Sequence, residues 1–369
     1  MPFVGGADAR RMRATPAMRL LVQKAKAPHK RALPLAALVA AGLAAPAGAA
    51  GAADFYAGKT IEMIVGSDVG GGYDIYTRAI ARHIGRHIPG NPTVVVKNMP
   101  GAGSGRAAAY IYSVAPKDGT SLGALFPGVM LSPLLDDRPD AAFDPTKVTY
   151  IGTADSGTRV CATFQGSKTK TFDDALKQKT RMGASGLGAS TRDYVLFKKK
   201  TTDVQFELVM GYKGSADILL AMERGEIDGI CGWDWTSVKS QRPAWIRDGK
   251  LNVLVQVGLQ SDPELTARGV PPLWRYISRE HDRKAVELIV TQQMFQRPYL
   301  APPGVPAEQI ATLRAAFDAT MQDEKFRTDA EKTRIDISPL PGAKVQELVD
   351  GIYATPKPIV ERAKEILRP

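Results

Sequence analysis

Glycine-rich loops that directly follow apolar runs are the part of this sequence best suited to binding a small anion. The first loop follows an apolar run at residues 63–65 and has five members: Gly70, Gly71, Gly72, Tyr73 and Asp74. Glycines let the backbone approach a bound group closely, and the first N–H groups of a helix have no partner within it. Helical hydrophobic spacing follows, so we expect Asp74 to be the N-cap of a helix. A tight turn that binds nothing explains the same residues.

The same order of strand, loop and helix recurs three times. Predicted strands at residues 93–97, 181–184 and 208–210 each run into such a loop. The loop residues that could bind a ligand are Gly101, Ala102, Gly103, Ser104, Ser185, Gly186, Ser190, Thr191, Tyr212, Lys213 and Gly214. Another predicted strand, at residues 227–231, opens onto Asp234 and Trp235. Because these loops follow the carboxyl ends of strands, the pattern predicts an α/β protein whose two lobes face each other across a ligand cleft.

The composition is typical of a globular protein, with 44% hydrophobic and 24% charged residues among 369. The net charge of +11 is concentrated near the start, because residues 1–53 contain eight of the 49 Lys and Arg and one of the 38 Asp and Glu. The rest of the chain therefore carries only +4. That charge is weak for a nucleic-acid-binding surface, so no nucleic-acid partner is expected.

Residues 1–53 have the three parts of an export signal. A basic region ends at Arg31, an apolar stretch covers residues 33–43, and small residues follow up to Ala52. The apolar stretch is shorter than the roughly 20 residues of a membrane-spanning helix. We therefore expect a signal peptide that is cleaved near residues 49–53 and a soluble periplasmic protein.

The sequence contains two cysteines, Cys161 and Cys231, and both fall in predicted strands. In an oxidising compartment they can pair as a disulfide, which would close a loop of about 70 residues and stabilise the fold by roughly 4 kcal/mol. The alternative is a pair of buried free thiols. A count of free thiols on denatured, unreduced protein distinguishes the two.

Two motifs that could support an enzyme each lack a required residue. The Ser185 loop resembles a nucleophile elbow, but Leu187 stands where G-x-S-x-G needs glycine, and His281 is the only later histidine. The Gly101 loop has Arg106 where a dinucleotide-binding motif has its third glycine. A secreted α/β hydrolase is therefore disfavoured, and a non-enzymatic protein without a cofactor is predicted.

His83 and His87 lie four residues apart on the first predicted helix, a spacing that can bind a metal ion. No third ligand is evident and arginines flank both histidines, so a solvated helix face is the favoured interpretation and no metal is expected. The charge run at residues 198–200 is expected at a helix end, where cations are favoured. The charged segment 279–283 is interpreted as solvated surface.

Five segments resemble, in order, the successive motifs of one family. They read VGSDVGGGYDIYTRAIARHI, VVVKNMPGAGSGRAAAYIYSVAPKDG, MGASGLGAS, GYKGSADILLAMERGEIDG and YLAPPGVPAEQIATLRAAF. On these motifs the chain resembles the Bug/TctC family, the periplasmic solute-binding proteins of tripartite tricarboxylate transporters. The likeness extends over nearly all residues after the leader, and the order of the motifs makes it specific.

This resemblance implies a Venus flytrap fold, with lobe 1 at residues 54–155 and 259–369 and lobe 2 at residues 156–258. It implies a monomer that closes on a small organic carboxylate, either a di- or tricarboxylate or an aromatic acid, and delivers it to membrane transporter subunits. The glycine loops would supply backbone amides and hydroxyls to the carboxylate oxygens. The helical tail after residue 307 is expected to pack on lobe 1.

The residues after Cys231 depart from the family pattern and leave two alternatives for the tryptophans. Trp233 and Trp235 either stack on an aromatic ligand or pack in the core. The partner is also open, since the same closure could signal to a sensor kinase in place of a transporter. Co-purification with one or the other would separate these functions.

Overall fold

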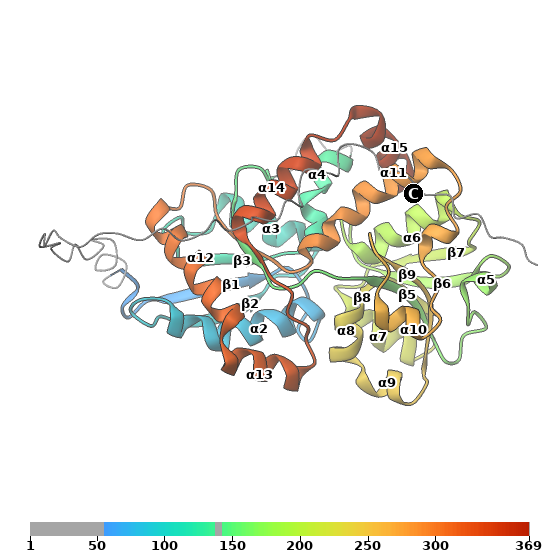
Figure 1. The fold of residues 1–369 in the computed structure, drawn as a ribbon, viewed down its shortest axis with the longest axis horizontal. Coiled ribbons are helices and arrows are strands. Elements are labelled where there is room, and N and C mark those ends of the chain that lie inside the picture. Colours follow the sequence, from blue (N-terminus) through green and yellow to red (C-terminus); the bar gives the residue numbers. More distant parts are fainter. Residues whose placement is uncertain (1–54, 137–141, 369) are drawn as a thin grey trace, which may run out of the picture. The chain divides into compact units, whose positions relative to one another are not determined.

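The computed structural model describes residues 55–136 and 142–368, and the predicted signal peptide with its cleavage site lies outside this range. Two β-sheets, each covered by helices, organise the described chain (Figure 1). Elements from the beginning and the end of the chain gather around the first sheet, and elements from its middle form the second. Among the described residues, no helix is both long and apolar enough to cross a membrane.

The first sheet is mixed and has the order β11-β4-β10-β3-β1-β2. Its strands are β1 (Thr60–Val65), β2 (Thr93–Asn98), β3 (Ser121–Ala124), β4 (Thr149–Thr153), β10 (Pro298–Ala301) and β11 (Leu340–Pro341). β1 pairs in parallel with β2 and β3, whereas β10 pairs antiparallel with β3 and β4. The loops after β1 and β2 therefore lie at one edge of this sheet, as the sequence predicts.

Helices from distant parts of the chain share the core of the first sheet. Ile80 and Leu313 are buried in one cluster with Met63 of β1, so the helical spacing of apolar residues forms the buried faces. The helices are α2 (Gly72–Ile84), α3 (Gly105–Ser113), α4 (Ser132–Leu135), α12 (Ala307–Gln322), α13 (Glu324–Thr333) and α14 (Gly342–Tyr353). Short 3-10 helices occur at Gly85–His87, Ala102–Ser104 and Pro127–Met130.

The second sheet has the order β7-β6-β8-β5-β9. Its strands are β5 (Arg159–Phe164), β6 (Thr180–Ala184), β7 (Phe206–Met210), β8 (Gly229–Asp234) and β9 (Leu251–Val257). β6 is parallel to β7 and β8, and β5 is antiparallel to β8 and β9. A disulfide between Cys161 and Cys231 joins the neighbouring strands β5 and β8.

The helices of the second sheet are α5 (Phe172–Ala175), α6 (Ser190–Thr201), α7 (Ser215–Glu223), α8 (Trp235–Gln241), α9 (Pro243–Arg247), α10 (Pro263–Ala267) and α11 (Glu280–Val290), with 3-10 helices at Leu273–Arg275 and Thr291–Phe295. α5 begins with the predicted capping box, in which Thr171 and Asp174 each accept from the other's backbone N–H. Leu265 of α10 is buried in one cluster with Val160 of β5. The segment after β9 therefore packs on the second sheet.

Two chain segments cross between the sheets side by side. The N–H of Ala154 donates to the oxygen of Arg297 over 3.1 Å, and the N–H of Gln296 donates to that of Asp155 over 3.0 Å. The first segment links β4 to β5, and the second leads from α11 to β10. These crossings are the part of the chain about which two lobes could rotate.

The last helix, α15 (Lys357–Leu367), contacts α4, α6 and α11. Val360 and Ile366 of α15 are buried in the same cluster as residues of α6 and α11. The helical tail was expected to pack on the first lobe: α12 and α14 do contact β4 of the first sheet, whereas α15 also contacts α6 of the second.

Two charges that were expected near solvent are buried. Asp282 of α11 is fully buried and accepts from Arg362 of α15 over 2.7 Å, so the interpretation of residues 279–283 as solvated surface was wrong at Asp282, whereas Arg279, Glu280 and His281 are exposed as expected. Lys198 lies in the last turn of α6, as predicted, but it is fully buried and its Nζ donates to the Tyr194 oxygen over 3.0 Å. Burial lowers the pKa of Lys198 well below its ordinary value.

Candidate ligand-binding site

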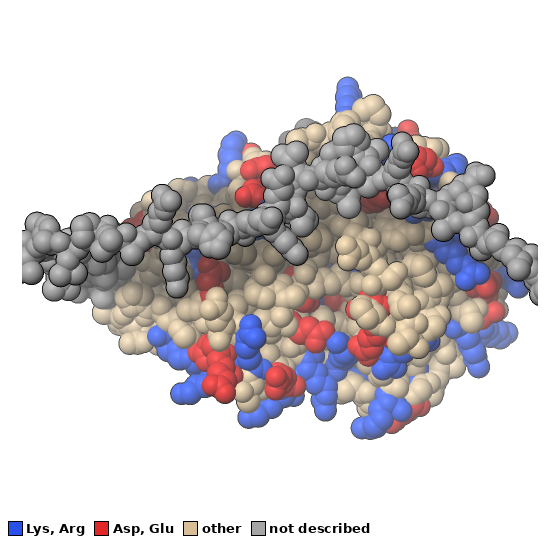
Figure 2. Space-filling view, in the orientation of Figure 1, with Lys and Arg blue, Asp and Glu red and all other residues tan. Residues whose placement is uncertain are grey.

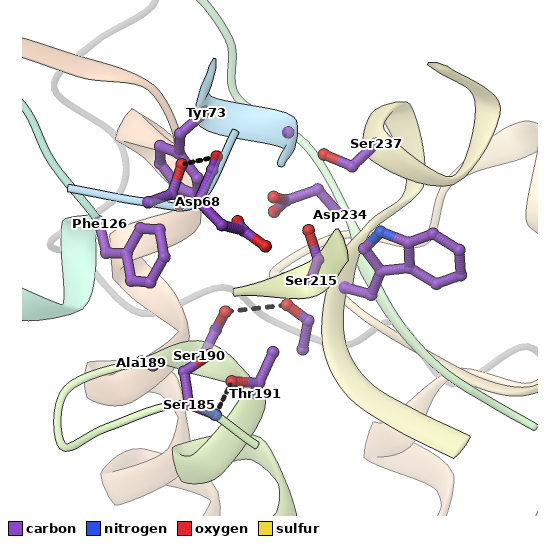
Figure 3. Close-up of a pocket in the computed structure, with 14 residues that line it drawn as sticks. Asp68, Tyr73, Phe126, Ser185, Ala189, Ser190, Thr191, Ser215, Asp234 and Ser237 are labelled. Atoms are coloured by element: carbon purple, nitrogen blue, oxygen red, sulfur yellow. Dashed lines mark hydrogen bonds between the residues drawn. The ribbon is translucent and has the colours of Figure 1, made fainter. Parts of the chain in front are cut away.

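Loops that follow strands of both sheets meet at one pocket (Figure 3). The lining residues are Ser67, Asp68, Gly72, Tyr73, Phe126, Ser185, Ala189, Ser190, Thr191, Ser215, Gly232, Trp233, Asp234 and Ser237. The free space among them is about 30 Å³, which is room for one or two water molecules. A larger ligand therefore needs the loops of the two sheets to separate.

Three helices, α2, α6 and α7, begin around this pocket. The first N–H groups of a helix have no acceptor within it and carry a partial positive charge. In the described structure none of the three helices has a hydrogen bond from a side chain at its N-cap. The amides at the starts of α2 and α6 can therefore bind carboxylate oxygens of a ligand, whereas at α7 the N–H of Asp217 already donates to Asp68 Oδ2 over 3.4 Å.

Hydroxyl groups provide much of the polar surface on the side of α6. Thr191 Oγ1 accepts from the N–H of Ser185 over 3.0 Å, and Ser190 Oγ donates to the oxygen of Gly232 over 2.9 Å. These bonds fix the loop between β6 and α6 against β8. The Oγ of Ser185 is buried and has no hydrogen-bond partner among the described residues. It can therefore donate to a ligand oxygen without breaking an existing bond.

Asp234 lies at the pocket between two buried arginines. Arg159 Nε donates to its Oδ1 and Arg297 Nη2 lies beside its Oδ2, each at 2.8 Å. Burial would raise the pKa of Asp234, but Arg297 and Arg159 lower it below its ordinary value. Burial would lower the pKa of each arginine, but the carboxylate raises it. All three groups are therefore charged, and Asp234 is fully neutralised.

Tyr73 and Phe126 supply an aromatic wall, with ring centroids 4.6 Å apart. The guanidinium of Arg297 lies 4.3 Å from the centroid of the Tyr73 ring, a cation–π geometry. Burial and the nearby Asp234 raise the pKa of Tyr73 to about 12, so its hydroxyl stays neutral. The two rings suit the apolar part of a small ligand.

Six residues predicted from the sequence line the pocket: Gly72, Tyr73, Ser185, Ser190, Thr191 and Asp234. The other predicted residues lie outside its lining, namely Gly70, Gly71, Asp74, Gly101, Ala102, Gly103, Ser104, Gly186, Tyr212, Lys213, Gly214 and Trp235. A direct role of the latter group in binding stays a prediction.

Asp74 supports the first loop but is not an N-cap. α2 begins at Gly72, with Gly71 as its N-cap, three residues earlier than predicted, so Asp74 lies within the first turn. Its carboxylate accepts from the N–H of Gly70 over 2.8 Å, from Asn98 Nδ2 over 2.9 Å and from Arg78 Nε over 2.9 Å. The N-cap prediction was therefore wrong, and the carboxylate instead holds the loop between β1 and α2 to the end of β2.

The second glycine loop holds its neighbours in place. Ser104 Oγ donates to the oxygen of Gly66 and accepts from the N–H of Phe126, each over 3.0 Å. A Cβ at Gly103 would lie 2.0 Å from the oxygen of Leu187, and the φ of Gly103 is +59°, so glycine is required there. This loop therefore positions the pocket walls formed by the loops after β1 and β6.

The two tryptophans after Cys231 have different positions. Trp235 is buried in a core cluster, and its Nε1 donates to Glu264 over 2.8 Å. Trp233 belongs to the same cluster but also lines the pocket, where its Nε1 donates to Gln241 over 2.8 Å. Trp235 thus packs in the core, and Trp233 is the tryptophan that a ligand could contact.

The lining residues that were not predicted are Ser67, Asp68, Phe126, Ala189, Ser215, Gly232 and Ser237. Asp68 had a signal in the sequence, because it lies three residues after a buried strand, where α/β folds bind ligands. Phe126 lies in the loop after β3 and Ser237 lies in α8, and the approach of both to the pocket depends on tertiary packing. No local pattern marks them.

The histidines that could suggest catalysis or metal binding lie outside the pocket lining. No histidine lines the pocket beside Ser185. His83 Nε2 lies 2.9 Å from Asp329, and His87 Nε2 lies 2.7 Å from Asp323. Within residues 55–136 and 142–368, no group of three or more potential metal-binding side chains is present.

Two helix-covered sheets with a pocket between their loops define a two-lobe α/β periplasmic-binding-protein fold. The structure is similar to that of the periplasmic binding protein BugD, with a TM-score of 0.65 and 19% identity, covering 84% of this chain and 97% of BugD. It is also similar to the structure of R. palustris Rpa4515 with adipate, with a TM-score of 0.64 and 18% identity, covering 83% of this chain and 97% of Rpa4515.

A third similar structure is MatC (Rpa3494) from Rhodopseudomonas palustris with bound malate, with a TM-score of 0.63 and 19% identity, covering 84% of this chain and 99% of MatC. The three likenesses show the fold. Neither a comparison with protein-family models nor one with curated proteins found a match.

Proposed function

We propose that this protein is a periplasmic solute-binding protein that captures a small organic carboxylate and delivers it to a tripartite tricarboxylate transporter. The observation that carries the proposal is the convergence of the starts of α2, α6 and α7 on one pocket that also holds the free hydroxyl of Ser185. Two proteins of similar fold have adipate or malate bound in their structures. The order of the glycine-loop motifs, which resembles the Bug/TctC family, supports the same function.

Recognition by backbone amides suits a carboxylate. Helix starts offer several N–H donors at fixed positions and a favourable dipole, without the cost of ordering a long side chain. The buried hydroxyl of Ser185 adds one donor, and the rings of Tyr73 and Phe126 cover the apolar carbons of the ligand. Enclosure of the ligand strengthens each of these bonds, because water is excluded.

Closure of two lobes about the paired crossing segments would produce this enclosure. The sequence predicted the second crossing at residue 258, but α10 packs with the second sheet, and we propose the crossing at residues 293–297, which pair with the first crossing segment. Lobe 1 then contains the first sheet and lobe 2 the second. Gln241 Nε2 of α8 donates to the oxygen of Gly70 over 3.0 Å, a bond between the lobes that opening would break.

In this function the leader directs export and is removed, and the protein works as a monomer in the periplasm. The shape that the ligand-bound lobes present to the membrane subunits differs from that of the open form, because closure rotates one lobe toward the other. The transporter thereby distinguishes loaded from empty protein. On the uncovered part of the face shown in Figure 2, Lys and Arg lie interspersed with Asp and Glu, mainly along its lower edge.

Isothermal titration calorimetry with a panel of small carboxylates tests the proposal. We expect at least one member to bind and, at a hundred times its Kd, to stabilise the protein by roughly 2.7 kcal/mol. Ser185→Ala should weaken that binding about threefold to tenfold without loss of stability, since it removes a hydroxyl that has no partner in the protein. Ser240→Ala, on α8 outside the pocket lining, is the matched control. Absence of binding across the panel would refute the function.

A further inference from the structure

Asp68 is a buried acid at the pocket that has no counter-ion. Asp68 is only 7% exposed, and among the described residues no group donates a hydrogen bond to its Oδ1. Its carboxylate lies at the start of α7, where its Oδ2 accepts from the N–H of Asp217 over a long 3.4 Å and backbone N–H groups oppose the rise in its pKa. Such a carboxylate is costly to bury unless a partner reaches it.

The pocket contains no cation that could serve Asp68. No lysine, arginine or histidine is among the lining residues, and Arg159 and Arg297 each form their ion pair with Asp234. Burial raises the pKa of Asp68 to about 6, so the group is still mainly ionised at neutral pH. One of the two acids at the pocket is therefore neutralised by the protein, and Asp68 is not.

The loops around Asp68 leave room for its carboxylate and direct it into the pocket. A Cβ at Gly214 would lie 2.0 Å from Asp68 Oδ1, and one at Gly71 would lie 2.4 Å from it. In Figure 3 the carboxylate points toward the centre of the group formed by Ser215, Asp234 and the loop of Ser190. The carboxylate group therefore lies at the pocket, with Oδ1 packed close to the glycines that leave room for it.

The Oγ of Ser185 is a second unpartnered polar atom on the opposite side of the pocket. It belongs to the loop before α6, whose uncapped start favours an anion. The pocket thus offers an acceptor without a donor at Asp68 and a donor without an acceptor at Ser185. A ligand with a cationic donor at one end and a carboxylate at the other satisfies both.

We propose that Asp68 is a specificity-determining residue that binds the ammonium group of the ligand, so that the ligand is an amino carboxylate and not a di- or tricarboxylate. This inference rests on the proposed carboxylate-binding function. Ser185 and the start of α6 bind the carboxylate, and Asp68 forms a charge-assisted hydrogen bond with the ammonium. A second carboxylate at this position would face Asp68 in a site of low dielectric, where like charges repel strongly.

Calorimetry with matched ligand pairs tests the inference on the purified protein. In each pair an ammonium replaces one carboxylate of a dicarboxylate, as in succinate and β-alanine, glutarate and 4-aminobutyrate, and adipate and 5-aminopentanoate. A set of natural α-amino acids is measured beside them. We expect the best amino carboxylate to bind at least about tenfold more tightly than its dicarboxylate partner.

The Asp68→Asn variant keeps the shape and removes the charge. We expect it to lose at least about tenfold in affinity for the amino carboxylate and to gain affinity for the dicarboxylate, with a melting temperature no lower than that of the original protein. Asp217→Asn, which removes a neighbouring charge that does not line the pocket, should leave the preference unchanged.

Tighter binding of dicarboxylates than of their amino partners would overturn the inference and leave the proposed function standing. An unchanged preference in Asp68→Asn would also overturn it, because Asp68 would then serve only the start of α7. If neither class of carboxylate binds, both the inference and the proposed function fail.

Discussion

Replacing Asp234 by asparagine should cause a large loss of stability. The side chains of Arg159 and Arg297 are 0% and 1% exposed, and each lies 2.8 Å from one oxygen of this carboxylate. Removing one partner of a buried ion pair costs about 3–5 kcal/mol, because the remaining charge is buried without compensation. An asparagine oxygen can still accept one of the two bonds, so we expect a loss near the lower limit, about 3 kcal/mol.

Urea unfolding followed by tryptophan fluorescence measures this loss, and thermal unfolding should show a decrease of about 6 °C in Tm, at roughly 2 °C per kcal/mol for a chain of this size. Asp248→Asn is the matched control. Its oxygen also lies 2.8 Å from an arginine, Arg247, but the two side chains are 35% and 75% exposed. The control should lose less than about 1 kcal/mol.

Losses of similar size in Asp234→Asn and Asp248→Asn would refute the reasoning. The two substitutions break contacts of the same length, so burial is the variable that distinguishes them. A small loss in Asp234→Asn would mean that water reaches the arginines when the carboxylate is removed, and that the pocket wall is not rigid.

Three further predictions concern buried groups. Burial raises the pKa of Asp155 to about 7 and that of Asp68 to about 6, so between pH 5 and 8 the folded state holds protons that the unfolded chain has lost. The free energy of unfolding should therefore rise as the pH falls from about 8 to about 5. A decrease in Tm over that range of falling pH would contradict this prediction. Replacing both Cys161 and Cys231 by serine should lower the free energy of unfolding, measured in urea, by roughly 4 kcal/mol, because the disulfide restricts the unfolded chain. A loss below about 1 kcal/mol would contradict this explanation. Lys198→Met should raise Tm, because it removes a buried amine that makes one hydrogen bond to a backbone oxygen. A lower Tm would show that this hydrogen bond stabilises the protein by more than the desolvation of the amine costs.

The parts of the fold that the sequence predicted depend on local patterns. β1, β2, α12 and the capping box of α5 follow from apolar runs, helical spacing and a short polar motif, each contained in fewer than 20 residues. The glycine loops follow from the same reasoning. Asp74 shows the limit of a local rule, because a good N-cap residue was present but the helix began two residues before it.

The residues that were missed depend on approaches between distant segments. Asp68 is buried because the start of α7, 149 residues later, comes close to it. Arg192 of α6 is buried and donates to the oxygen of Leu367 in α15, 175 residues later. A single sequence gives the type of such residues but not the neighbours that decide whether they are solvated, paired or orphaned.

Asp68 and Asp234 show how these neighbours determine the role of an acid in one pocket. Asp234 receives two arginines from the protein, so its charge belongs to the framework and its removal should destabilise the protein with or without a ligand. Asp68 receives no cation from the described residues, so its removal should leave stability intact and change which ligand is preferred. If the two substitutions had the same effect on stability and the same effect on binding, the distinction between a framework acid and a ligand-binding acid would not hold. A difference in both measurements would show that the ligand supplies the positive charge that this part of the pocket lacks.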